Sequence, residues 1–435
     1  MWKKVLFGIW VITFMMCLSG CSGNPDVKGK TKISLMYWGS PAEKAAVASY
    51  VKSFEKKYPH IYVELIHKPG SNYNDALQTM IAGNNPPDVM YMGMEDFPFF
   101  ASKGAFLNLD SCMSDDTTFN KSDFYELLMN VFKYNGIQYG IPKDFATLVL
   151  YYNKDLFDKA GVAYPNDNWT WKDFRSAAEK LTLDKDGDGK PDQYGFVVEP
   201  GLHHWQMWVW QNGGEVMSPD GKQWVLGDPK YKSQNIEALN YQLEMIYGPK
   251  PIAPTRAVTA DRNTAELFKT GCLAMCATGR WMCMDYKDIK HFKWNIVPLP
   301  HNKKRAATLI TTSYAISSTT KHPKEAWELV KFLTGPDGQI EIAESGHAIP
   351  SMIKYAESDH FLKCPVLPSD LNNKANLDVV NYSRPTPTSP CFNEIADALV
   401  REMDLVWNNK ESPKEAIEKL QPKIEKIIKD NETSK

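Results

Sequence analysis

A run of aspartates near the middle of the chain has the spacing of a calcium-binding loop. Counted from the first aspartate, carboxylates stand at positions 1, 3, 5 and 9, glycine stands at position 6, and position 7 offers a backbone carbonyl, as in loops that bind Ca²⁺ through oxygen atoms. Position 12, where such loops carry a bidentate glutamate, is Gly195. Ligation would need Asp192, water or a distant carboxylate to complete it. The spacing predicts a structural calcium site, and a solvated acidic turn is the alternative. The loop residues are Asp184, Asp186, Asp188, Lys190 and Asp192.

A second chemical signal lies at the N-terminus. Lys3 and Lys4 precede an apolar run over residues 5–16, and Leu18-Ser19-Gly20-Cys21 follows it. This layout predicts an export signal that is removed as residues 1–20, because the apolar run is too short to span a bilayer, which takes about 20 residues. The four residues resemble the bacterial lipobox, in which the cysteine is lipidated and becomes the new N-terminus. Residues 21–30 are then a lipidated flexible tether.

The other cysteines and the overall charge limit the possible functions. Disulfides are permitted outside the cell, but the pairing stays open, and small buried hydrophobes are the favoured interpretation. These cysteines are Cys112, Cys272, Cys276, Cys283, Cys364 and Cys391. A formal net charge of −2 without a basic run argues against nucleic acid as a partner. The sequence also lacks a Gly-x-Ser-x-Gly elbow, a His-Glu-x-x-His helix and a phosphate loop, which disfavours an enzyme.

Strands and helices alternate in the part of the chain that follows the tether. Strands are predicted over 33–38, 61–66 and 88–92, with helices after Ser40 and over about 74–82. Ser40-Pro41-Ala42-Glu43 is a capping box with proline at the first helical position. Further helices are expected after Thr170, after Pro323 as far as Gly335, and over about 393–407 and 413–428. The pattern predicts α/β sheets that bind ligands at the carboxyl ends of their strands.

Several short motifs occur in an order that resembles one family. They are Gly83 to Val89, Tyr139 to Pro142, Tyr151 to Phe157, Phe268 to Gly271, Ala274 to Trp281, Tyr314 to Ser317, Lys321 to Pro323, Phe332 to Thr334 and Ala348 to Pro350. Together they resemble the extracellular solute-binding proteins of bacterial ABC importers, in the carbohydrate-binding family that includes maltose-binding protein.

The resemblance implies a class II periplasmic-binding-protein fold, in which two α/β lobes close on a ligand by hinge motion. The segments that join the lobes are expected near 142–147, 300–312 and 345–350. Lobe one would comprise residues 31–142 and 310–345, and lobe two residues 143–309 and 346–435.

The resemblance also directs attention to side chains that suit a sugar, which presents apolar C–H faces and hydroxyl rims. Trp281 matches a position where the family stacks an aromatic ring on the ligand. Of Trp205, Trp208 and Trp210, one or two are expected to reach the cleft; strand alternation would separate Trp205 from the other two, whereas helical spacing would put it beside Trp208. The ligand-binding candidates are Trp38, Ser40, Glu43, Glu95, Asp96, Asp144, His204, Trp205, Trp208, Trp281 and Arg384.

The function implied is that of a monomeric, lipid-anchored receptor on the outer face of the bacterial membrane. It would capture a mono- or oligosaccharide between its lobes and deliver it to an ABC importer permease, without catalysis. A binding protein for peptides or polyamines is the first alternative, and a secreted carbohydrate-active enzyme is the second.

Overall fold

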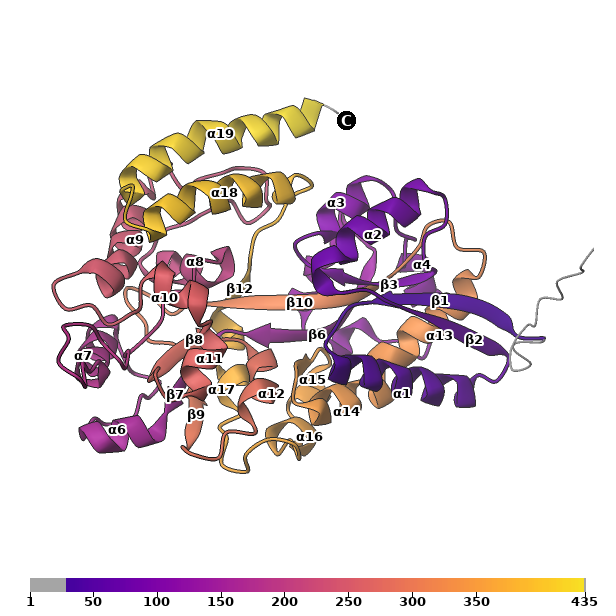
Figure 1. Cartoon of the computed structure of the whole chain (residues 1–435). Coiled ribbons are helices and arrows are strands. Elements are labelled where there is room, and N and C mark those ends of the chain that lie inside the picture. The colour runs from indigo at the N-terminus through magenta and orange to yellow at the C-terminus, as the bar shows by residue number, and fades with distance from the viewer. Residues whose placement is uncertain (1–28, 434–435) are drawn as a thin grey trace, which may run out of the picture.

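The structure is a computed structural model that describes residues 29–433. Figure 1 shows two lobes, with strands β6 (Gly140–Thr147) and β10 (Ala307–Ile316) running from one lobe into the other. The predicted signal segment, Cys21 and most of the tether lie outside the described residues. Among the helices of residues 29–433, none is long and apolar enough to cross a membrane.

Lobe one is built on three parallel strands. β1 (Thr31–Tyr37) pairs with β2 (Ile61–His67) on one side and with β3 (Val89–Gly93) on the other. α2 and α3 lie on one face of these strands and α1 on the opposite face (Figure 1). The other elements are α1 (Pro41–Lys57), α2 (Gly70–Ala82), α3 (Phe97–Ser102), α4 (Asp110–Asp115), η2 (Lys121–Asp123), α5 (Glu126–Val131), the hairpin β4 (Lys133–Tyr134) and β5 (Ile137–Gln138), α13 (Pro323–Thr334) and α14 (Pro336–Ser345).

The sheet of lobe one continues into the strands that join the lobes. Its order is β11-β6-β10-β3-β1-β2, with β11 (Ile349–Pro350) on β6 and β12 (Ser383–Pro385) on β10. One end of β10 pairs antiparallel with β3, and the other end pairs with β12. β6 and β10 pair antiparallel with each other from Leu309 to Ala315 of β10, with a register shift between Thr312 and Ser313. These two paired strands therefore form the hinge between the lobes.

Lobe two holds a smaller antiparallel sheet in the order β8-β7-β9. Figure 1 shows its C-terminal helices α18 and α19 side by side in yellow on the outside of the lobe. Its elements are β7 (Val149–Asn153), α6 (Lys154–Ala160), α7 (Trp171–Leu181), α8 (Leu202–Gln211), α9 (Lys232–Tyr247), α10 (Arg256–Asp261), α11 (Thr264–Lys269), β8 (Met275–Thr278), η3 (Arg280–Met282), α12 (Cys283–Tyr286), β9 (Trp294–Val297), α16 (Asp359–Leu362), α17 (Ala375–Asp378), η4 (Val380–Tyr382), α18 (Phe392–Trp407) and α19 (Pro413–Thr433).

Each lobe has its own hydrophobic core, drawn from two separate stretches of the chain. The core of lobe one takes residues between 33 and 141 and between 314 and 352, whereas that of lobe two takes residues between 148 and 307 and between 364 and 428. A small third cluster around Phe145 and Leu309 packs at the hinge. After residues 345–350 the chain continues through α15 (Ile353–Ala356), where Tyr355 packs against the core of lobe one, and reaches the core of lobe two at Cys364.

Local sequence signals explain most of the elements that position the cleft. In α1 the Ser40 hydroxyl accepts from the Glu43 N–H, the Glu43 carboxylate accepts from the Ser40 N–H, and Pro41 fills the first helical position. α7 begins in the same way at Thr170 and Asp173. α2 begins at Gly70, before the predicted residue 74, and α19 continues to Thr433, beyond the predicted residue 428.

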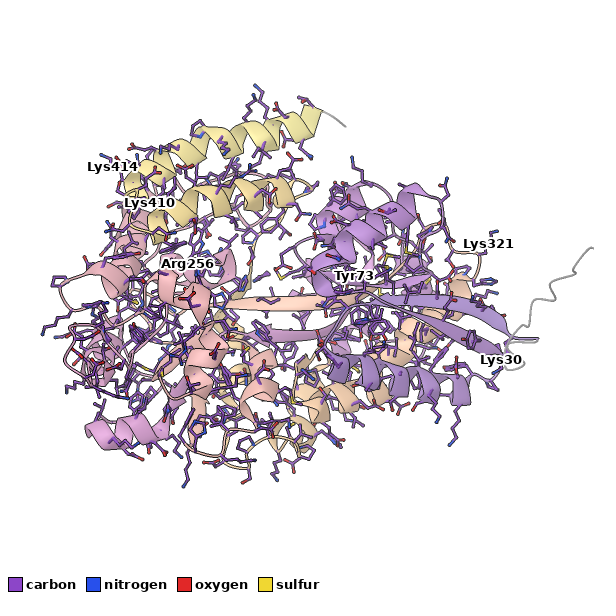
Figure 2. All side chains as sticks on the ribbon, viewed as in Figure 1. Lys30, Tyr73, Arg256, Lys321, Lys410 and Lys414 are labelled. Carbon is purple, nitrogen blue, oxygen red and sulfur yellow. The ribbon has the colours of Figure 1, made fainter. Side chains whose placement is uncertain are left out.

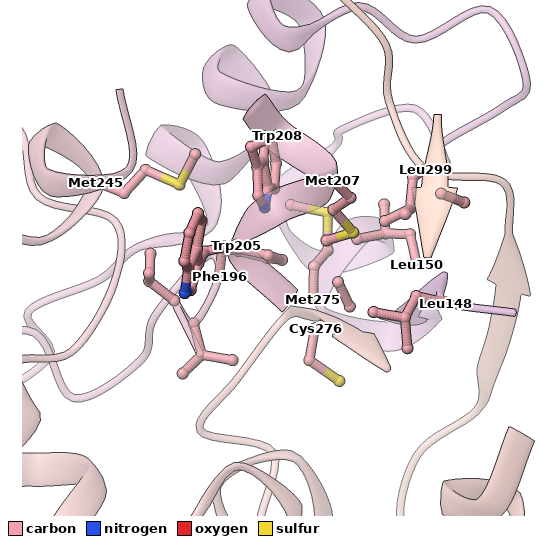
Figure 3. Close-up of a cluster of buried hydrophobic side chains, with 14 of the residues drawn as sticks. Leu148, Leu150, Phe196, Trp205, Met207, Trp208, Met245, Met275, Cys276 and Leu299 are labelled. Carbon is pink, nitrogen blue, oxygen red and sulfur yellow. The ribbon is translucent and has the colours of Figure 1, made fainter. Parts of the chain in front are cut away.

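The tryptophan-rich segment folds as helix α8, so the strand alternative is excluded. Trp205, Trp208 and Trp210 are at most 3 % exposed. Figure 3 shows Trp205 and Trp208 among buried side chains of lobe two that include Phe196 and Met207. Every residue from Trp205 to Gln211 is buried, so this part of α8 is packed on all sides.

No disulfide joins the six cysteines within residues 29–433. Four of them are buried, which agrees with the favoured interpretation, while Cys112 and Cys272 are partly exposed.

Candidate functional site

One cavity lies between the lobes, against the hinge strands. This first cavity has a volume of about 630 Å³. Lobe one contributes Trp38 and the N-terminus of α1, the hinge contributes Asp144 and Thr312, and lobe two contributes Trp281. Residues from the carboxyl end of β1 and from the β8–α12 connection thus face one space. Other lining residues include Ser40, Glu43, Tyr50, Tyr91, Lys143, Met284, Asp285, Lys287 and His347.

Two half-buried tryptophans from opposite lobes line this cavity. Trp38 is held edge-on by two tyrosines, with ring centroids 4.7 Å from Tyr73 and 5.4 Å from Tyr91. The Tyr73 hydroxyl donates to the Met36 and Tyr91 carbonyls, and Figure 2 places Tyr73 on the side of lobe one that faces lobe two. These contacts fix the plane of Trp38. Trp281 lies close above its own loop at Gly279.

A charged pair on the hinge strand β6 supplies polar groups to the same cavity. Asp144 is 7 % exposed, forms an ion pair with Lys143 and accepts a 2.6 Å hydrogen bond from the Thr312 hydroxyl. The Lys143 ammonium also lies 5.1 Å from the centre of the Tyr91 ring. Burial alone would lower the pKa of Lys143, but the neighbouring Asp144 raises it above its ordinary value. Lys143 therefore stays charged, and the pair offers a donor and an acceptor that can orient ligand hydroxyls.

A second cavity, of about 230 Å³, brings Glu95 of lobe one next to His203 and Trp205 of lobe two. Burial raises the pKa of Glu95 to about 7, and the charge of Asp96 acts in the same direction. Burial also lowers the pKa of His203 to about 3, so this imidazole is neutral at neutral pH.

A third cavity, of about 540 Å³, lies between the β4–β5 hairpin of lobe one and two segments of lobe two, the prolines around 385–390 and the end of α19. The second and third cavities share Thr386. The boundary between the lobes is therefore hollowed over much of its length.

The geometry agrees with what comparisons with known proteins show. The family model for bacterial extracellular solute-binding proteins matches residues 38–340. The chain belongs to this family. A solved ABC substrate-binding protein of Listeria monocytogenes, in complex with cycloalternan, is 28 % identical with a TM-score of 0.82, covering 91 % of this chain and 98 % of that one.

Two further relatives show how far the likeness extends. The arabinooligosaccharide-binding protein of Bacillus subtilis is 25 % identical over 77 % of this chain and 76 % of its own. A maltodextrin-binding domain of Bdellovibrio bacteriovorus, solved with maltotriose, is 23 % identical with a TM-score of 0.75 over 92 % of this chain and all of that one. The predicted family and the predicted two-lobed α/β fold are thereby confirmed.

Five predicted ligand residues of this solute-binding protein meet in the first cavity. Two of them already have a local partner, because Ser40 and Glu43 cap α1 through each other. Glu95 and Trp205 meet in the second cavity, although Trp205 is only 1 % exposed. Asp96 accepts a 3.0 Å hydrogen bond from the Asn393 side chain, across the boundary between the lobes. The five residues of the first cavity are Trp38, Ser40, Glu43, Asp144 and Trp281.

Three other predicted residues of the solute-binding protein lie away from these cavities. His204 and Trp208 border a space of about 10 Å³ inside lobe two, because α8 turns them toward the core. Arg384 forms a 2.7 Å ion pair with Glu215, and its guanidinium lies 4.4 Å from the centre of the Trp210 ring. A structural partner therefore already holds this cation.

Sequence reasoning missed several lining residues. Lys143 directly precedes the predicted Asp144. The adjacent opposite charges were the sequence signal that could have identified Lys143 as a lining residue. His203 precedes His204, and only the register of α8 decides which of the two faces the second cavity. Thr312 and Asp285 carried no local signal.

The aspartate loop of the solute-binding protein lies on the surface of lobe two, away from the three cavities. Asp184, Asp186 and Asp188 offer carboxylate oxygens that all lie within 4.8 Å of one another. The backbone turns at Gly187 and Gly189, both with positive φ, and their N–H groups donate to Asp184. This donor set fits a hard cation in part.

Two positions of the loop, Asp192 and Gly195, offer a cation fewer carboxylate oxygens than the calcium-loop pattern requires. One Asp192 oxygen accepts from the Lys185 N–H. A Cβ at Gly195 would lie 2.2 Å from the Ala178 carbonyl oxygen, so packing excludes a glutamate there.

Proposed function

We propose that this solute-binding protein captures a sugar, either a single ring or an oligosaccharide, between its two lobes and hands it to an ABC importer permease. The observation that carries the proposal is the pair Trp38 and Trp281, half-buried tryptophans that face one cavity from opposite lobes. Flat aromatic faces stack on the C–H faces of sugars, and closing the lobes would bring the two rings toward a shared ligand.

The polar groups of the first cavity suit neutral hydroxyls better than a polyamine. A polyamine needs a cage dominated by carboxylates, whereas here Lys143 and Lys287 line the same cavity as Glu43, Asp144 and Asp285, and Asp144 has Lys143 as its partner. Mixed donors and acceptors are what a hydroxyl rim requires. The names of the relatives, among them arabinooligosaccharide-binding and maltodextrin-binding proteins, support a sugar ligand.

The test is a binding panel on the chain without residues 1–20. Maltotriose, mannotriose and diacetylchitobiose are compared with a tripeptide and spermidine, using tryptophan fluorescence and the melting temperature. Ligand at 100 times its Kd should stabilise the protein by about 2.7 kcal/mol, because it binds the folded state alone. We expect at least one sugar to shift both signals. A shift with spermidine or the peptide alone would refute the sugar proposal.

We further propose that a lipid on Cys21 anchors the protein to the outer face of the cell membrane. The order of a short cationic start, an apolar run and Leu18-Ser19-Gly20-Cys21 supports it. A receptor that serves a permease gains from a high local concentration at the membrane.

In bacterial cells that express the full chain, the Cys21→Ser variant should lose partition into detergent and leave the membrane fraction. The unchanged chain and a Cys112→Ser variant, altered at a partly exposed thiol, serve as controls. Membrane retention of Cys21→Ser equal to that of the controls would contradict the anchor.

A further inference from the structure

Glu95 lies between the lobes without a basic partner. It follows β3 and lines the second cavity, where lobe two contributes His203 and Trp205. An oxygen of its carboxyl group lies 3.5 Å from the position that a Cβ on Gly93 would take, and the Trp38 ring lies 4.0 Å from the same point. Glu95 is therefore close to the first cavity as well as the second.

The surroundings of Glu95 are largely apolar. On the α18 side the cavity is lined by Phe392, Ala396, Leu399, Val400 and Met403, none of which ionises. Within residues 29–433, no other side chain donates a hydrogen bond to the Glu95 carboxyl, and no lysine or arginine forms an ion pair with it. A carboxylate here has lost part of its water and gained no positive charge.

The ionisable groups around Glu95 do not compensate for this loss. On its own loop, Asp96 carries the same charge and opposes ionisation of Glu95. On α8, His203 borders the cavity and lies beside His204, with the ring centroids 4.3 Å apart and the rings tilted; burial keeps the pKa of both imidazoles well below neutral. Trp38, which follows β1 and lies close to the same point near Gly93, does not ionise. The acid form of Glu95 is thus favoured up to neutral pH.

We propose that Glu95 takes part in ligand capture as the neutral acid, donating its hydroxyl proton in a hydrogen bond to a ligand oxygen that can only accept. In a sugar such oxygens are the ring oxygen and the glycosidic oxygen. A carboxylate would face their lone pairs and repel them, so ligand affinity falls as the medium becomes alkaline. This inference rests on the proposed function, because it assigns a role within the same interlobe site.

The first experiment needs no ligand. The melting temperatures of the unchanged protein and of Glu95→Gln are compared from pH 5 to pH 9, with Glu357→Gln, an exposed glutamate, as the matched control. The folded state raises the pKa of Glu95, so its ionisation destabilises the fold above the unfolded pKa, and the penalty is complete above about pH 7. Glu95→Gln, which cannot ionise, should melt above the unchanged protein at pH 8–9, and this gap should shrink toward pH 5. A gap that does not change with pH overturns the proposal.

The second experiment measures the Kd of the sugar that binds best in the panel of maltotriose, mannotriose and diacetylchitobiose. If only the acid form captures ligand, Kd follows the protonated fraction and rises about a hundredfold between pH 6 and pH 9. Glu95→Gln, whose amide can donate at every pH, should show a flat profile, and Glu357→Gln should follow the unchanged protein.

Equal pH slopes in the unchanged protein and in Glu95→Gln overturn the role of Glu95 while sugar capture itself stands. If no sugar binds at any pH, the proposed function fails, and the capture role of Glu95 fails with it. The melting experiment then shows separately whether the acid form exists in the folded protein.

Discussion

The ring of Trp281 lies against the backbone of its own loop, and only a residue without a side chain leaves room for it. A Cβ on Gly279 would stand 2.1 Å from Cζ3 of the Trp281 ring. Gly279 has φ −94° and ψ 175°, which any residue can adopt, so the backbone itself does not require glycine. Glycine is therefore needed at position 279 because it leaves room for the Trp281 ring in this orientation.

Replacing Gly279 should impair the site without unfolding the protein. In Gly279→Ala the new methyl group displaces the indole, and loss of a stacked aromatic contact should weaken ligand affinity by about tenfold, or about 1.4 kcal/mol. Isothermal titration with the best sugar of the panel measures the effect. Gly70→Ala, where a Cβ meets nothing within 4 Å, is the control. Unchanged affinity in Gly279→Ala would show that the ring orientation seen here is unimportant.

Sequence reasoning located the residues that follow a clear positional rule. Trp38 stands at the carboxyl end of a strand, and Trp281 lies in a motif shared with the family; both line the first cavity. Packing sets the rotation of α8 about its axis, and this rotation decides which side of the helix meets the cleft. His204 and Trp208 therefore face the core. The role of Arg384 depended on Glu215, which lies far away in the sequence.

At the scale of elements, the aspartate loop has the turn geometry of a cation loop but lacks one ligand. We propose that it binds Ca²⁺ weakly, with water in place of the carboxylate that Gly195 cannot provide. Asp184 already collects backbone N–H groups from both turn glycines, and these hydrogen bonds lower its pKa. The carboxylate is therefore ionised and held in position for a cation.

Millimolar Ca²⁺ should raise the melting temperature by a degree or more, and chelator should reverse the rise. Adding a cation that binds only the folded state stabilises it by mass action. Asp186→Asn should abolish the response, whereas Asp220→Asn, altered in another exposed turn of lobe two, should retain it. An equal response to Ca²⁺ in both variants would assign the effect to general surface binding.

Element prediction succeeded where end signals are local. The capping boxes at Ser40 and Thr170 give the starts of α1 and α7 because each involves residues only three apart. The secondary structure of the segment that forms α8 was ambiguous in the sequence. A helical period and a strand period would each place large apolar side chains on a buried face.

At the scale of the molecule, one hydrogen bond joins the lobes at the rim of the cleft. The Asn393 side chain, at the start of α18, donates to Asp96, at the start of α3, over 3.0 Å. An exposed hydrogen bond to a charged group contributes about 1 kcal/mol or less, which is enough to bias lobes that open and close with small free-energy differences.

Removing this contact should favour more open arrangements. Asn393→Ala should increase the radius of gyration of the ligand-free protein in small-angle X-ray scattering and raise the Kd by up to about fivefold. Asn408→Ala, at the far end of the same helix, is the control, because its side chain bonds only within α18. A radius of gyration and a Kd that match the control would assign no role to the contact.

The division into lobes could be predicted only through the family resemblance. Hydrophobic periodicity gives the strands of lobe one, but nothing local shows that β10 pairs with β3 at one end and with β12 at the other. The third segment that joins the lobes, expected near residues 345–350, stays a prediction, because its limits depend on packing, with Tyr355 against the core of lobe one and Cys364 in that of lobe two.

The interleaved cores have a consequence for synthesis. Lobe one cannot complete its core until Tyr314, Trp327 and Leu333 have been made, because these residues pack against strands that were translated far earlier. The N-terminal third of a nascent chain therefore remains without its partners while the intervening lobe is still being translated. Until then the apolar side chains that will pack against these residues stay exposed to water.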